Sequence, residues 1–189
     1  GLTDRLDLAL RRTNVDQQFE LTGKFAVFKQ VPSGSPLSLA VLASGARDTA
    51  EASAHRNHYA AGLMLTRQFG SHLSLELAPF YASRTNTEQV SDTRGTSAVG
   101  VGALWRFNDL LGVTLEWVPP VSGVTAKYQG ASVGLSIGTA RHSFHLLLTN
   151  TPYAHSSQFV TGGDLDWGAG DFRLGFNITR TFGLSAGRY

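Results

Sequence analysis

The feature that most constrains this chain is an alternation of apolar with small or polar residues along almost its whole length. In the segment 73–77, for example, Leu73, Leu75 and Leu77 share one face, while Ser74 and Glu76 fall on the other. A period of two is typical of a β-strand with two unlike faces, because successive side chains point to opposite sides of the pleat. The chain is therefore predicted to be all-β.

Ten segments show this alternation strongly enough to be expected as strands. They centre on residues 6–12, 18–30, 37–46, 58–69, 73–84, 97–107, 112–119, 130–138, 143–149 and 171–182. Most are close to the length of about 9–11 residues with which a tilted strand crosses a bilayer. No run of about 18 apolar residues is present, so no transmembrane helix is predicted.

The connections between these segments alternate in length. Tight connections are expected at residues 32–36, 70–72, 108–112 and 139–142, and longer polar ones at 47–57, 85–96, 120–130 and 150–170. The short connection at 13–16 is an exception. Bacterial outer-membrane barrels have short periplasmic turns and longer outer loops. The alternation of short and long connections predicts one antiparallel up-and-down transmembrane β-barrel, with both ends periplasmic and the segment 150–170 external.

Alternation alone does not decide which face meets lipid, because a soluble lipocalin-like barrel also alternates, with its apolar face inward. Here the polar face consists mainly of Gly, Ser, Ala and Thr, and charged residues make up only 16% of the chain, against about 25% in typical soluble domains. Small residues with a few charges suit a narrow lumen. We therefore expect the apolar face to contact lipid in the bacterial outer membrane. The charged residues expected to face the lumen are Glu76, Arg106, Glu116 and Arg173.

Four segments carry a resemblance to known proteins. They are Gly1–Leu6, which resembles a turn into a barrel strand, Asn108–Trp117, His145–Thr151 and Gly168–Arg180, the last of which contains Gly-Asp-Phe-Arg-Leu-Gly-Phe-Asn-Ile-Thr-Arg. Together they resemble an uncharacterised family of bacterial outer-membrane β-barrels, whose members end on a similar strand. The chain is predicted to be one β-barrel domain over residues 1–189, of about ten to twelve strands. The resemblance implies that about two further strands precede Gly1, so the intact barrel would have about twelve. The family supplies no activity and no functional residue to transfer.

Some of the predicted loops contain residue types that can ligate metal ions. His55, His58 and His155 would bind a metal if they converged, but loop histidines are more often simply solvated. Asp164, Asp166 and Asp171 lie in a Gly-rich stretch that could supply oxygens to Ca²⁺, but their spacing matches no helix-loop-helix site. The chain has no cysteine, which excludes disulfides and thiolate ligands. We predict no metal and no cofactor.

A catalytic interpretation finds little support. His145 could share the lumen with Ser132 and Ser136, but no Gly-x-Ser-x-Gly motif is present. The Gly100-Val101-Gly102 segment lies inside a predicted strand and lacks the third glycine of a dinucleotide loop. The net charge of +2 gives no basis for nucleic-acid binding. The chain is predicted not to be an enzyme.

Two functions remain after these exclusions. In the first, the chain is a structural or docking subunit of the membrane with a restricted lumen, whose partners are the lipid bilayer and a protein of a membrane complex. In the second, it is a passive, porin-like pore for small solutes. Mixed charges in a narrow lumen favour the first, because we expect Arg106 and Glu116 to pair there, with Glu76 at a similar level.

Overall fold

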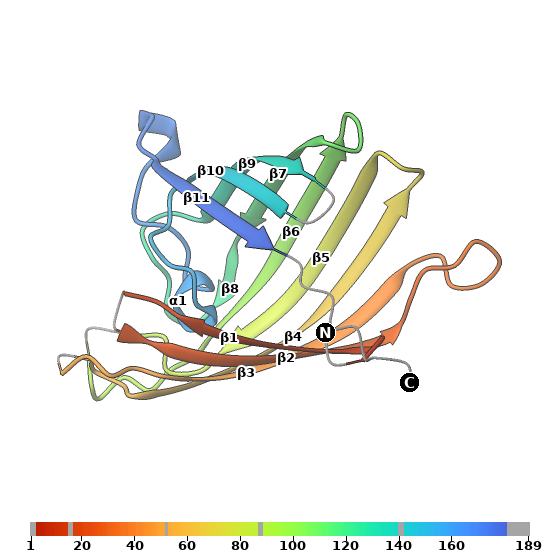
Figure 1. Cartoon of the computed structure of the whole chain (residues 1–189). Helices are drawn as coiled ribbons and strands as arrows, with labels where there is room; N and C mark the ends of the chain where they lie inside the picture. Colours follow the sequence, from red (N-terminus) through yellow and green to blue (C-terminus); the bar gives the residue numbers. More distant parts are fainter. Residues whose placement is uncertain (1–2, 15–16, 52, 87–88, 140–141, 181–189) are drawn as a thin grey trace.

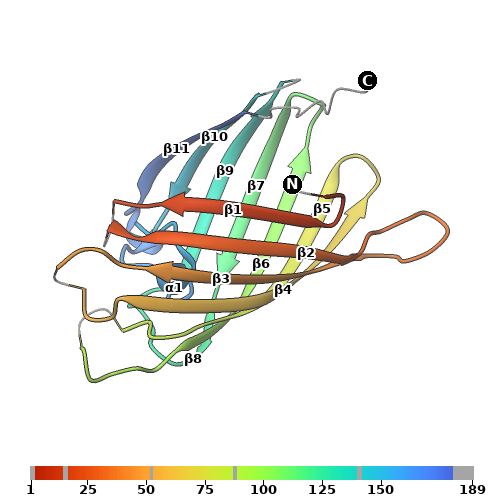
Figure 2. The same cartoon turned by 60° about the horizontal axis from the view of Figure 1, so that its bottom comes forward.

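The computed structural model describes residues 3–14, 17–51, 53–86, 89–139 and 142–180. They form one strongly curved antiparallel sheet (Figures 1 and 2). Its strands are β1 (Leu6–Arg12), β2 (Phe19–Phe28), β3 (Ser38–Arg47), β4 (Asn57–Phe69), β5 (Leu73–Ala82), β6 (Thr96–Arg106), β7 (Leu111–Val118), β8 (Pro120–Ser122), β9 (Gly130–Gly138), β10 (His142–Thr149) and β11 (Arg173–Arg180). Two short helical turns, α1 (Ser156–Phe159) and η2 (Trp167–Ala169), lie between β10 and β11.

The strands follow one another around the sheet in the order of the chain. The short β8 lies off this path and pairs with β6, as β7 also does. Only Pro119 separates β7 from β8, and proline has no N–H to give to a ladder. These two strands are therefore one crossing interrupted at a proline, and the sheet crosses the molecule ten times in eleven strands.

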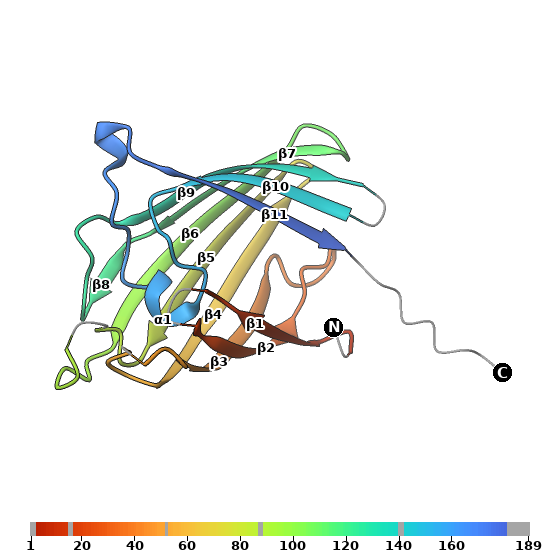
Figure 3. The ribbon, with the colours of Figure 1, turned by 60° about the vertical axis from the view of Figure 1, so that its left-hand side comes forward.

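The all-β, antiparallel, up-and-down architecture predicted from the alternation is confirmed, and each long strand lies within a few residues of its predicted position. The prediction missed β8, α1 and η2, none of which is long enough to show a period. The path of the sheet begins at β1 and ends at β11, and these two edges are not paired with each other in the described residues (Figure 3). Closure of the barrel thus stays a prediction.

The two faces of the sheet differ as the alternation requires. Apolar side chains are exposed on the convex face; Leu115 is 54% exposed and Leu174 is 74% exposed. The concave face encloses α1 (Figure 3). A group of buried apolar residues, Ala60, Ala82, Ala98, Val118 and Val160, packs there with Phe80 and Phe159. Neither helical turn among the described residues is long and apolar enough to cross a membrane.

Candidate functional site

The segment between β10 and β11, residues 150–172, folds back into the concave side of the sheet, and we call it the inner loop (Figures 1 and 3). Its short helix α1 presents Phe159 to the apolar group on the wall, followed at once by Val160, which is fully buried. The sequence predicted an outer loop here and did not predict that it turns inward. The physical reason is that Phe159 of α1 and the adjacent Val160 bury apolar surface against the concave face of the sheet. The alanines of that face have small side chains, which leave room for the helix.

Asn150 fixes both ends of the inner loop. Its side-chain oxygen accepts a hydrogen bond from the Ala131 amide (2.9 Å), and its side-chain nitrogen donates to the carbonyls of Gln129 (2.8 Å) and Leu165 (3.2 Å). Its own carbonyl accepts from the Asp164 amide at 3.1 Å. Residues 150 and 164 therefore lie side by side, and the intervening residues form a closed excursion.

The inner loop meets the wall in a buried group of polar side chains, which we call the polar cluster. Its members are Gln18, Glu20, Asp48, His58, His155 and Ser157, none more than 3% exposed. Gln18 donates to Asp48 at 2.6 Å and to Ser157 at 3.4 Å. The hydroxyl of Ser157 lies 3.1 Å from Nδ1 of His155. The cluster thus joins the beginning of β2 to the inner loop.

Ionic contacts complete the polar cluster. Nε2 of His58 lies 3.0 Å from a carboxylate oxygen of Asp48. Arg11 contacts Glu20, its direct neighbour across the β1–β2 ladder, at 2.8 Å. The same guanidinium nitrogen donates to the carbonyl of Ala154 at 2.8 Å. Arg11 is therefore a second link between the wall and the inner loop.

Several buried polar atoms in and beside the cluster have no hydrogen-bond partner among the described residues. They are Oε1 of Gln18, Oε1 of Glu20, Nδ1 of His58, Nε2 of His155 and Nε2 of Gln158. Burial without a partner costs about 1–3 kcal/mol for each such group. Burial also lowers the pKa of His155 to about 4, although the carboxylates of Asp48 and Glu20 oppose this shift. The inner loop is held by a polar contact that is incompletely satisfied.

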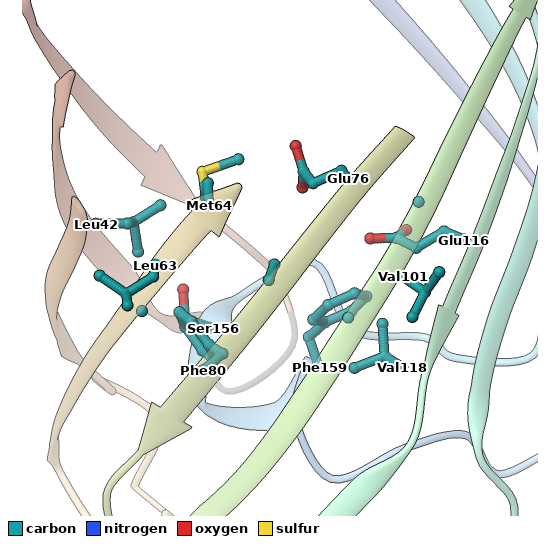
Figure 4. Close-up of a pocket in the computed structure, with 14 residues that line it drawn as sticks. Leu42, Leu63, Met64, Glu76, Phe80, Val101, Glu116, Val118, Ser156 and Phe159 are labelled. Atoms are coloured by element: carbon teal, nitrogen blue, oxygen red, sulfur yellow. The ribbon is translucent and has the colours of Figure 1, made fainter. Parts of the chain in front are cut away.

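Two cavities flank α1 on the concave side. The first, of about 190 Å³, is lined mostly by apolar side chains and by the carboxylates of Glu76 and Glu116 (Figure 4). The second, of about 350 Å³, shares Glu116 and Phe159 with the first and also reaches His155. Ser156 and Phe159 of α1 line both cavities, so the helix lies between them.

The four charged residues predicted to face a lumen are placed differently from one another. Glu76 and Glu116 line one cavity, and Ser132 donates to Glu116 at 3.3 Å. Arg173 binds Asp164 of the inner loop through two hydrogen bonds of 2.6 and 2.8 Å. Arg106 lies opposite Gly112 in the ladder, whereas Glu116 lies opposite Gly102. The predicted pairing of Arg106 with Glu116 is therefore wrong, because the register separates them by four residues along the strand.

The predicted solvated state of the three loop histidines is also wrong. His55 is 9% exposed, His58 2% and His155 1%. Within the described residues, no three His, Cys, Asp or Glu side chains are placed so as to hold a metal ion. Of the aspartates considered for Ca²⁺, Asp164 binds Arg173, and the side chain of Asp166 accepts a hydrogen bond from the amide of Gly168.

The residues weighed for catalysis do not form a triad. His145 lies opposite Ser136 in the β9–β10 ladder, and Ser132 interacts with Glu116. The structure instead brings His155 and Ser157 together with His58 and Asp48 in the polar cluster. These four residues come from three separate parts of the chain, so the spacing in the sequence gave no sign of the cluster.

The chain was compared with families of known proteins, with curated proteins and with solved structures. A family model described as "membrane bound beta barrel domain" (DUF5777) matches residues 1–182. No curated protein and no solved structure matches the chain.

Proposed function

Since the chain belongs to this family of membrane-bound β-barrel domains, we propose that it is a structural or docking subunit of a bacterial outer membrane, with a lumen restricted by its own inner loop. The observation that supports the restriction is the seating of α1 against the concave wall, with Val160 fully buried. The proposal assigns no enzymatic role. Its partners are the lipid bilayer and a protein of a membrane complex.

Closure of the sheet is part of this proposal. The edges of β1 and β11 carry backbone N–H and C=O groups that need partners in hydrocarbon, where water is absent. A closed sheet removes both edges. The sheet makes an even number of crossings, so β1 and β11 run in opposite directions and can join an antiparallel barrel directly or through a further hairpin.

A passive pore is the alternative. It is favoured by the two cavities beside α1 and by the carboxylates of Glu76 and Glu116 that line them. A pore with these groups would prefer cations over anions. The two proposals differ in whether ions pass while the inner loop is seated.

Single-channel recording in planar bilayers separates them. We expect little conductance at neutral pH from the wild-type protein. Replacing residues 152–163 by a short Gly-Ser linker should give large, stable steps, because this change removes α1 and leaves Asn150 in place. A short linker suffices since the Asn150 carbonyl and the Asp164 amide are hydrogen-bonded.

The matched control replaces residues 89–94, in the connection between β5 and β6, by a linker of the same kind, and it should stay closed. Large steps in the wild type at neutral pH would contradict the restricted lumen and favour the pore.

A further inference from the structure

We propose that the inner loop is a releasable plug, and that protonation of His155 releases it from the concave wall and opens the lumen at acid pH. This inference rests on the restricted lumen of the proposed function and adds a condition under which the restriction is lifted. It does not depend on the docking role.

The geometry makes the tip of the inner loop separable from the wall. Two polar links join that tip to β1 and to the residue before β2: Arg11 to the Ala154 carbonyl, and Gln18 to the Ser157 hydroxyl. Its apolar contacts are those of Phe159 and Val160 with alanines and Val118. Backbone hydrogen bonds of Thr161 and Gly163 to residues 126 and 128 hold the returning end of the loop, outside the tip. The anchor at Asn150 lies at the base of the excursion, so residues 151–160 can leave without breaking it or the backbone bonds of residues 161 and 163.

His155 is the titratable side chain of the plug that lies deepest. Its ring is 1% exposed, its Nδ1 faces Ser157, and its Nε2 has no partner among the described residues. The charged groups that surround it from other elements are Arg11, Glu20, Asp48 and His58. Glu116 lies across the shared cavity. On the inner loop itself, the ring of Tyr153 is 5.8 Å from the ring of His155.

The carboxylates near His155 already have partners. Glu20 binds Arg11, and Asp48 binds both His58 and Gln18. A second positive charge on His155 would add to those of Arg11 and of any protonated His58, at a side chain that is only 1% exposed. In the released plug the same ring is hydrated, and it takes up a proton readily.

The direction of the pH effect follows from this difference. The pKa of His155 is lowered to about 4 in the seated plug, against about 6.5 for a free histidine. The released state therefore binds the proton more tightly, and the seated state is fully favoured above about pH 6.5 and loses stability as the pH falls toward 4. Linkage predicts a rise of about 30-fold in the ratio of released to seated plug between pH 7.5 and 5.0.

A thiol reporter measures the release directly, since the chain has no cysteine. Gln158→Cys places a thiol on α1 at a position that is 3% exposed, and the side-chain nitrogen lost there has no partner among the described residues. Its rate of reaction with a membrane-impermeant maleimide is measured in lipid vesicles at pH 7.5 and 5.0. Thr93→Cys, on an exposed connection, corrects for the effect of pH on the reagent. We expect the corrected rate to rise about 30-fold in acid.

Two histidine variants in the Gln158→Cys background assign the effect. His155→Gln should abolish the acid response, whereas His72→Gln, at an exposed turn, should retain it. An acid response that survives His155→Gln would overturn the proposal, as would a corrected rate that does not change with pH in the parent. In either case low conductance of the wild type at pH 7.5 would leave the restricted lumen standing. High conductance at pH 7.5 would overturn both proposals.

Discussion

Replacing Asn150 by alanine is expected to lower the free energy of unfolding by about 2–4 kcal/mol. The substitution removes three hydrogen bonds of a side chain that is 1% exposed, and it leaves partly buried backbone groups of Gln129, Ala131 and Leu165 without that partner. Urea titration of the purified protein in detergent measures the effect. The loss of the anchor should also make the inner loop sensitive to proteinase K.

Two further variants sharpen this test. Gly163→Ala should act in the same direction, because a Cβ at residue 163 would overlap the side chain of Asn150. Asn108→Ala is the matched control: its side chain accepts two backbone hydrogen bonds, at 2.9 and 2.8 Å, but in an exposed turn. It should cost about 1 kcal/mol or less. Equal effects of the Asn150 and Asn108 substitutions would show that the anchor is not structural.

An arginine in place of Leu115 is expected to cost about 2–4 kcal/mol, the range for a charge at the middle of the lipid face of a barrel. Leu115 is 54% exposed on the convex face of β7. The next residue, Glu116, points to the concave side and lines a cavity. Glu116→Arg should therefore cost much less, since its charge stays out of lipid and close to Glu76.

The pair is compared by urea titration after folding into vesicles of a short-chain phosphatidylcholine. If Glu116→Arg proved the more destabilising of the two, the convex face would not be the lipid face. The comparison is internally matched, because both substitutions introduce the same side chain at adjacent positions of one strand.

The strands could be predicted from the sequence because each carries its own signal. In segments such as Leu73–Ala82, the alternation arises from the contrast between the two faces of a curved sheet, so a local window is enough to detect it. The tight turn at 108–112 was found for a similar reason. The register across that turn was not predicted correctly. Arg106 lies four residues along the strand from Gly102, the residue that pairs with Glu116.

The inner loop could not be predicted from local patterns. Its helix has four residues, too few for a helical period to appear. The contact of Gln18 with Ser157 joins residues that are 139 positions apart. In the sequence, Glu20 and Asp48 look like ordinary charged residues near the ends of strands. In the structure they are buried, because residues 150–172 fold back against them.

The hydrogen bond that joins the backbone of Asn150 to that of Asp164 also has a consequence for assembly. No ladder of the sheet depends on residues 151–159, so the strands can insert and pair before the excursion takes up its position. Its polar contacts come from β1 and the residue before β2 on one side and from β9 on the other, and its apolar contacts come from β4 to β7 between them. These groups face one another only after the sheet has curved. We therefore expect the sheet to form before the excursion takes its place inside it. Substitutions among residues 151–159 can then change what occupies the concave side of the sheet, while the strands still insert into the membrane in the same way.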